Sequence, residues 1–278
     1  MANRNYEARK FELDKAQNTV DALTVEEALQ ININGTAFTV TMRTPGDDVS
    51  LVRGLLHVEN SINDVTFIPN IVLKKENENG IVTIVDVVVP QDKLGDGYTN
   101  KRSLLSVSSC GICGKTELSD LSFIGKTIDD AKTIEASLLS TLFGKMNALQ
   151  HSFKKSGGTH AAAIFTLQGK LLSIMEDIGR HNAVDKAVGK LINTHQLKEA
   201  SVLTVSGRIS YEIVIKCFKA KIPFIAAVSA PSSLAVDYAK ELGITLFAFC
   251  RDNRATCYSH IERIKNTNLN AITAHKVS

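Results

Sequence analysis

The sequence contains no tryptophan, and aromatic residues make up only 6% of its 278 positions. Because nucleic-acid bases are commonly stacked on such side chains, their scarcity argues against a single-stranded nucleic-acid-binding protein. The chain also lacks any apolar run approaching the roughly 18 residues of a membrane-spanning helix. Its first 17 residues are polar and contain no apolar signal core, so we expect a cytoplasmic protein without a secretory signal.

Cysteine is sparse and irregularly spaced. The chain has five cysteines, an odd number at scattered spacings, which argues against a disulfide-stabilised scaffold. In the cytoplasm such thiols stay mostly reduced. The formal net charge of +3 is compatible with anionic ligands but too small to indicate a nucleic-acid-binding protein. The 44% of hydrophobic and 22% of charged residues are typical of a globular protein with a full core.

The N-terminal part predicts a small α+β domain at residues 21–115, preceded by a loose tail at residues 1–20. Asn34-Gly35 stands between alternating apolar residues, which is a strong signal for a β-hairpin. A helix and a second pair of strands are expected to follow. The domain is expected to end in a mobile loop that is rich in glycine and serine.

Residues 116–278 predict an α/β domain. In its last third, apolar strands and amphipathic helices alternate in the order βαβαβ. This order requires a parallel sheet with right-handed crossovers, and continuously apolar strands indicate that helices cover both faces. Ligands of such sheets bind beyond the carboxyl ends of the strands.

Three loops follow the predicted parallel strands. The first two lead into helix N-termini, where free N–H groups and the helix dipole favour anions, and arginines add paired donors. Alternatively, the serines are ordinary N-caps and the arginines are solvated. Taken together, the loops predict a site for an anionic, nucleotide-like ligand. Its candidate residues are Ser206, Gly207, Arg208, Ser229, Ser232, Cys250, Arg251, Asp252, Asn253 and Arg254.

A second group of polar residues follows a glycine pair and comprises His160, Arg180, His181 and Asp185. Part of this pattern is typical of a helix start. Two histidines near carboxylates are also compatible with a metal site or an acid–base pair, and either histidine can be purely structural. Because the charges are concentrated beside a glycine-rich loop, we favour a ligand pocket.

The segment "SSCGICGK" at residues 108–115 places Cys110 and Cys113 two residues apart. A structural zinc site needs four ligands, usually two such pairs, and only one is present. A zinc deaminase needs a His-x-Glu motif before its cysteine pair, whereas here His160 follows the pair and lacks the glutamate. A redox dithiol usually precedes a helix, and the sequence after Cys113 is weakly helical at best.

Covalent carriage of sulfur is the remaining interpretation of the two thiols. A thiolate in an open, glycine-rich loop can attack a persulfide and hold its terminal sulfur, and a second thiol can release it. Lys101, Arg102 and Lys115 would favour the thiolate electrostatically. The residues alone leave this interpretation open beside the redox and zinc alternatives.

Several motifs, taken in order, closely resemble the FdhD family of formate dehydrogenase accessory sulfurtransferases. They are "SSCGICGK", "SGGTHAAA", "EDIGRHNAVDKAVG", "SGRISYEIVIK", "VSAPSSLAV" and "FCRDNRATCY". The N-terminal segments "ALTVEEALQININGTAF" and "RTPGDDVSLVRGLL" are also similar to this family. The resemblance spans roughly residues 20–260.

The resemblance implies a sulfur carrier with a C-terminal α/β/α domain similar to cytidine deaminases. Such proteins take persulfide sulfur from a cysteine desulfurase and pass it to the molybdenum bis-guanine dinucleotide cofactor, which formate dehydrogenase receives. It implies a homodimer without a permanently bound metal. By position, Cys110 corresponds to the persulfide-bearing cysteine and Cys113 to its partner.

The resemblance also implies how the cofactor is bound. Phe249 to Arg254 correspond to the family's C-terminal cofactor-binding segment. Arg208, Arg251 and Arg254 are candidates for clamping phosphates, and Asp185 or Asp177 for contacting a guanine edge. The alternative function is a nucleotide-binding accessory or chaperone module whose cysteine pair binds zinc or acts in redox chemistry.

Overall fold

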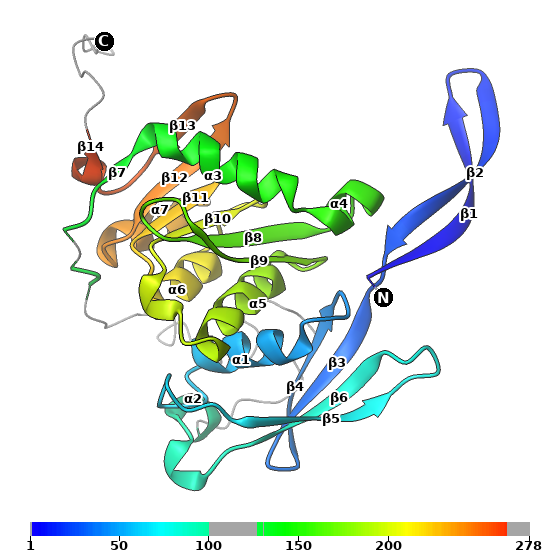
Figure 1. Cartoon of the computed structure of the whole chain (residues 1–278), viewed down its shortest axis with the longest axis horizontal. Helices are drawn as coiled ribbons and strands as arrows, with labels where there is room; N and C mark the ends of the chain where they lie inside the picture. The colour runs from blue at the N-terminus through cyan, green and yellow to red at the C-terminus, as the bar shows by residue number, and fades with distance from the viewer. Residues whose placement is uncertain (1, 100–126, 130, 266–278) are drawn as a thin grey trace.

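The computed structural model describes residues 2–99, 127–129 and 131–265 (Figure 1). It is a mixed α/β structure built around two larger sheets. The first sheet has the order β4-β3-β6-β5, formed by β3 (Glu27–Ile33), β4 (Thr36–Arg43), β5 (Asn70–Glu76) and β6 (Val82–Val88). β3 pairs antiparallel with β4 and parallel with β6. The predicted hairpin turn is confirmed, because Asn34 and Gly35 connect β3 to β4 with positive φ angles.

Helix α1 (Asp48–Val58) buries one face of this first sheet. Leu51, Val52 and Leu56 are fully buried and share a core with the inward-facing residues of β3 and β6. The last element described before residue 100 is the short helix α2 (Asp96–Thr99). The predicted loop with Cys110 and Cys113 lies outside the described residues.

The second sheet has six strands in the order β13-β12-β11-β10-β8-β9. They are β8 (His160–Phe165), β9 (Leu171–Asp177), β10 (Val202–Val205), β11 (Phe224–Ala227), β12 (Thr245–Arg251) and β13 (Arg254–Cys257). The predicted parallel pairing is confirmed for β10, β11 and β12. The sheet as a whole is mixed, because β8, β9 and β13 pair antiparallel with their neighbours.

Helices cover both faces of this sheet (Figure 1). On one face lie α5 (Arg180–Asn193), α6 (Tyr211–Lys219) and α7 (Ser233–Glu241), packed on alternate strand residues such as Ala162 and Leu203. On the other lies α3 (Ala136–Ala148), packed on residues such as Phe165 and Phe224. Smaller elements are α4 (His151–Ser156), β7 (Ile134–Glu135) and β14 (Ile264–Lys265).

The segment predicted as a loose tail is instead a long β-hairpin. β1 (Asn3–Glu12) and β2 (Lys15–Thr24) pair antiparallel along their whole length and project from the body of the molecule (Figure 1). The polar composition concealed this pairing, since a strand exposed on both faces needs no apolar alternation. At its base, Thr24 Oγ1 lies 2.7 Å from Ser156 Oγ in α4.

The two units meet where α1 crosses α5. At this crossing Gly54 of α1 lies against the backbone of Asp185, and Gly189 of α5 lies against the backbone of Ser50. Both glycines lack a Cβ where one would overlap the facing helix, so the two backbones approach closely. No helix among residues 2–99, 127–129 and 131–265 is both long and apolar enough to cross a membrane.

Candidate functional site

The three predicted loops lie side by side at the carboxyl edge of the parallel strands. Ile209 N–H donates to the Ala230 carbonyl, and Ser232 N–H donates back to the Ile209 carbonyl. Phe249 N–H in turn donates to the Ser229 carbonyl. These backbone hydrogen bonds join the loops into one rim, as the βαβαβ pattern predicted.

His160 and Arg180 also lie at this rim. β8 runs antiparallel to β10, which brings His160 at its start beside the end of β10. Gly207 lies against both side chains. A Cβ on this glycine would lie 3.2 Å from His160 Nδ1 and 3.5 Å from Arg180 Cδ. The absence of a side chain at Gly207 therefore leaves room for His160 and Arg180 next to the exposed Arg208.

The rim is electropositive. Burial lowers the pKa of His160, and the positive charges of Arg180 and Arg208 lower it further. The imidazole is consequently neutral at pH 7. The Arg180 Nε atom is buried and has no hydrogen-bond partner among the described residues. A buried donor of this kind is costly unless a ligand accepts from it.

Two helix N-termini point to the same rim. α5 begins at Arg180, shortly after the end of β9, and α6 begins at Tyr211, after the loop that follows β10. The first N–H groups of a helix have no partner inside it and attract anions. The N-caps of these two helices, Gly179 and Ser210, make no side-chain capping hydrogen bond. Backbone donors and two arginines thus converge where an anionic group could bind.

His181 and Ser232 have internal partners. His181 Nε2 lies 3.1 Å from Glu212 Oε2 and 3.1 Å from Ser210 Oγ, and its ring is buried. The hydrogen bond from His181 holds the pKa of Glu212 below its ordinary value. Ser232 caps α7 by accepting from Ala235 N–H, which is the ordinary N-cap role considered for the serines. The sequence did not reveal Glu212 as the partner of His181.

Asp185 does not face the rim, which corrects its placement among the ligand-binding candidates. Its carboxylate is buried and accepts from Lys216 Nζ at 2.6 and 2.8 Å. Asp177 is likewise fully buried, in an ion pair of 2.8 Å with Lys186. Both carboxylates neutralise lysines in the interior, so neither can contact a guanine edge.

The predicted C-terminal segment forms the β12–β13 hairpin. Asp252 and Asn253, both with positive φ, make its turn, and Asn253 Oδ1 accepts from Ser140 Oγ in α3. Arg251 and Arg254 are exposed on this hairpin. The turn thus leans toward the α3 face of the sheet, whereas Arg180 and Arg208 lie where α5 and α6 begin.

Two neighbouring residues of this segment face different ways. Phe249, with a φ of 54°, is partly exposed beside the Ser229 loop. Cys250 is buried in the core under α3, and burial raises the pKa of its thiol to about 12. Cys250 therefore supports the hairpin from within, and its side chain is not available to a ligand.

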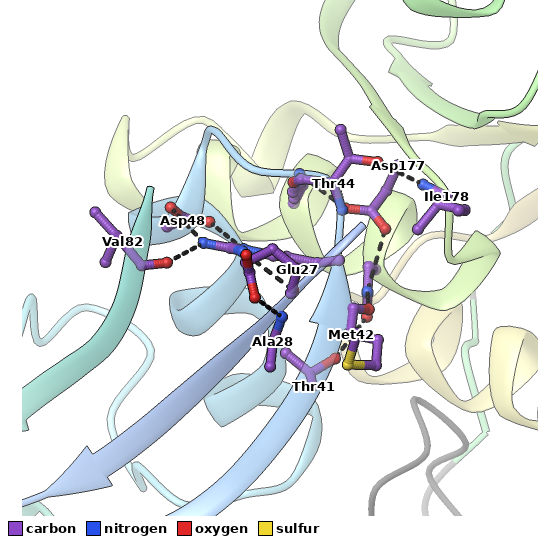
Figure 2. A network of polar contacts seen from close by, with 12 residues as sticks. Glu27, Ala28, Thr41, Met42, Thr44, Asp48, Val82, Asp177 and Ile178 are labelled. Carbon is purple, nitrogen blue, oxygen red and sulfur yellow. Dashed lines mark hydrogen bonds and ion pairs between the residues drawn. The ribbon is translucent and has the colours of Figure 1, made fainter. Parts of the chain in front are cut away.

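A polar network connects the rim to the N-terminal unit through Thr44, which follows β4 (Figure 2). Thr44 N–H donates to Asp177 Oδ2, and Thr44 Oγ1 accepts from Ile178 N–H at 3.0 Å. Lys186 Nζ donates to the Thr44 carbonyl at 2.8 Å. These contacts fix the turn that leads from β9 into Arg180, so one unit positions the arginine of the other.

Replacing Thr44 by valine is expected to lower the free energy of unfolding by about 1–3 kcal/mol, because the partly buried Ile178 N–H loses its acceptor. Thr44→Ser keeps the hydroxyl and is expected to cost less than half as much. Denaturation in guanidinium chloride measures both changes. A smaller loss in Thr44→Val than in Thr44→Ser would show that the methyl group, rather than the hydrogen bond, stabilises this junction.

Three of the five cysteines lie in the described part of the chain, and none of these is poised as a nucleophile. Burial raises the pKa of the Cys217, Cys250 and Cys257 thiols. No group of three or more histidine, cysteine, aspartate or glutamate side chains gathers there to hold a metal ion. Cys110 and Cys113 lie outside the described residues, and their proposed role rests on the sequence.

Comparisons with known proteins match this chain along most of its length. The sequence model described as the FdhD/NarQ family matches residues 24–265. The sulfur carrier protein FdhD of Streptomyces avermitilis is 42% identical over 251 residues, which cover 88% of this chain and 89% of that protein. The protein of the same name from Sulfolobus acidocaldarius is 40% identical, with coverages of 92% and 98%.

A solved structure has the same fold. The crystal structure of a protein from Desulfotalea psychrophila, assigned as a formate dehydrogenase accessory protein, superimposes with a TM-score of 0.75. The alignment covers 95% of this chain and all of that chain at 20% sequence identity. At this identity the likeness concerns the fold.

Proposed function

Since the chain belongs to the FdhD/NarQ family, we propose that it is a sulfur carrier for the maturation of formate dehydrogenase. Its Cys110 receives persulfide sulfur from a cysteine desulfurase. It passes this sulfur to the molybdenum bis-guanine dinucleotide cofactor, which is its transient substrate and which formate dehydrogenase then accepts. The helices on both faces of the six-stranded sheet support a cytidine deaminase-like arrangement.

The observation that carries this proposal is the electropositive rim. Each guanosine end of the cofactor is joined to its pterin through a pyrophosphate. Arg180 with its unpartnered Nε, Arg208, and the N-termini of α5 and α6 supply charged and neutral donors of the kind that bind pyrophosphate. Phe249 is exposed near the same rim, on the side of Ser229, where an apolar ring could contact a base.

Sulfur loading is a displacement at sulfur. The Cys110 thiolate attacks the outer sulfur of the donor's persulfide, the donor's S–S bond breaks, and its cysteine leaves as a thiolate. Cys110 now holds the persulfide. One persulfide is lost on the donor and one is formed on Cys110, so this step needs neither an oxidant nor a reductant.

Sulfur release uses the second thiol. The Cys113 thiolate attacks the Cys110 sulfur, the persulfide S–S bond breaks, and the outer sulfur leaves as hydrosulfide toward the molybdenum end of the cofactor. A Cys110–Cys113 disulfide forms, so the two electrons that reduce the sulfur come from the dithiol. A cellular dithiol of thioredoxin type must then reduce this disulfide before the next cycle.

The arginines of the rim provide the test of cofactor binding. Arg208→Ala and Arg180→Ala are each expected to weaken the binding of guanosine diphosphate about tenfold or more, because a charge-assisted hydrogen bond contributes about 1.5–3 kcal/mol. Isothermal titration calorimetry measures the dissociation constants, with inorganic pyrophosphate as a second probe that reports the phosphate contacts alone.

Lys240→Ala serves as the matched control. Lys240 is an exposed cation in the last turn of α7, at the end of that helix opposite the rim. Its removal changes the net charge by the same amount and should leave both affinities unchanged. Affinities that stay at the wild-type level in both arginine variants would remove the rim from the binding site.

A further inference from the structure

The β1–β2 hairpin has features that the sulfur-carrier function does not explain. Every residue of β1 from Arg4 to Glu12 is exposed. Apolar side chains are exposed along the hairpin too, including Phe11 at 71% and Val20 at 62%. Among the described strands, β1 and β2 pair only with each other, so each offers one open edge. Long open edges are templates for pairing with another chain.

We propose that β1 pairs antiparallel with β1 of a second copy of this chain, with Ala8 on the twofold axis. This joins two hairpins into a four-stranded sheet by an isologous contact, in which each residue i faces residue j of the partner and j faces i. The ten residues of β1 span about 34 Å, which is long for an unpaired strand edge.

The sequence of β1 is complementary to itself in this register. In an antiparallel pair, residues directly opposite each other lie on the same face and interact, and opposite charges stabilise the pair. Because of the symmetry each contact between two different residues occurs twice. The facing pairs are Arg4 with Glu12, Glu7 with Arg9, Tyr6 with Lys10, Asn5 with Phe11, and Ala8 with itself.

The two neighbouring registers oppose like charges. A twofold axis at Glu7 places this glutamate against its own copy and Arg4 against Lys10. A twofold axis at Arg9 places two arginines face to face. Since directly opposed like charges destabilise a strand pair, the charge pattern selects the register centred on Ala8.

The open edge of β2 is a weaker candidate for the same contact. Its best self-complementary register, centred on Asn18, gives one kind of charged pair, Lys15 with Asp21, whereas β1 gives two kinds. The hairpin precedes the stretch that matches the family, which begins at residue 24. The proposed contact uses neither the cysteine pair nor the rim, so it stands independently of sulfur transfer.

Charge-reversed variants test the pairing in the full-length protein. Glu7→Arg places an arginine opposite Arg9 in each of the two symmetric pairs, and Arg9→Glu places a glutamate opposite Glu7 in each of them. Each variant alone is expected to raise the dissociation constant of the arm contact about tenfold or more. An equimolar mixture of the two variants restores both attractive pairs, so it should associate as the wild type does. Analytical ultracentrifugation measures all three samples.

Asp21→Arg is the matched control, since it reverses one charge on β2 and should leave association unchanged. Equal association of the wild type, Glu7→Arg and Arg9→Glu would overturn the proposal. Loss of association in Asp21→Arg alone would also overturn it, because the contact would then use β2. Failure of the mixed variants to associate would exclude the register centred on Ala8.

A cross-link locates the twofold axis even if two copies of the chain also associate through a surface outside the hairpin. In a Cys110→Ala, Cys113→Ala background, Ala8→Cys is expected to form an intermolecular disulfide under mild oxidation, because facing residues in an antiparallel pair have Cα atoms about 4.5–5.5 Å apart. Thr19→Cys faces Ala8 within the hairpin, on the strand away from the proposed contact, and should cross-link far less. Equal yields would contradict the pairing through β1.

Discussion

Replacing Cys110 by alanine is expected to reduce the activation of formate dehydrogenase to background, whereas Cys250→Ala should leave it near the wild-type level. Sulfur transfer needs a thiolate that a bulky donor can reach. Burial raises the pKa of Cys250 to about 12 and also raises the pKa of Cys217 and Cys257. These three thiols are therefore protonated at pH 7, and the proposed function assigns the sulfur to the Cys110–Cys113 pair.

The measurement combines two readouts. Formate dehydrogenase activity is followed after incubation with a cysteine desulfurase, cysteine, the cofactor and the carrier variant. In parallel, mass spectrometry of the loaded wild type locates the added sulfur atom, which a reductant should remove. Cys113→Ala separates the two thiols: it should still load sulfur on Cys110 but release it slowly.

Three outcomes would contradict the proposed function. Sulfur found on Cys257 or Cys250 instead of Cys110 would show that burial does not suppress those thiols. Full activation by the Cys110→Ala variant would exclude a covalent carrier at this position. Tightly bound zinc in a stoichiometric amount would favour the alternative of a zinc-binding accessory module.

Local sequence patterns sufficed for much of the second sheet and its rim. Asn34-Gly35 sets a hairpin through the conformations that its two residues tolerate, and the βαβαβ run sets parallel pairing because its strands are short, apolar and separated by helices. The carboxyl edge of such a sheet follows from its topology. The three loops could consequently be placed together from the sequence alone.

Pairings between distant residues could not be predicted in the same way. Nothing in the sequence around Asp185 shows whether it contacts a ligand or forms an ion pair with Lys216, which lies on another helix. Thr44 contacts Asp177 and Ile178 across 133 and 134 positions of the chain, and no local motif records this. The β1–β2 hairpin was missed for a related reason, since an arm that is exposed on both faces has no apolar alternation.

The roles of the glycines inside helices could not be predicted from the sequence either, and replacing them is expected to change the stability strongly. Gly54, Gly189 and Gly144 all lie inside helices, where glycine costs about 1 kcal/mol relative to alanine. The structure separates them. A Cβ on Gly54 would lie 1.9 Å from the Asp185 carbonyl oxygen, and one on Gly189 would lie 1.9 Å from that of Ser50. A Cβ on Gly144 meets nothing within 4 Å.

The same substitution should therefore have opposite signs at these positions. Gly54→Ala and Gly189→Ala are each expected to lower the free energy of unfolding by about 3 kcal/mol or more, because two helix backbones must separate and the Thr44 contacts at the same junction loosen. Gly144→Ala is expected to raise it by about 0.5–1 kcal/mol, since a solvent-facing helix position only loses conformational freedom in the unfolded chain. Denaturation in guanidinium chloride compares the three variants. If Gly54→Ala proved as benign as Gly144→Ala, α1 and α5 would not cross in contact, and the N-terminal unit could not hold Arg180 at the rim through Thr44.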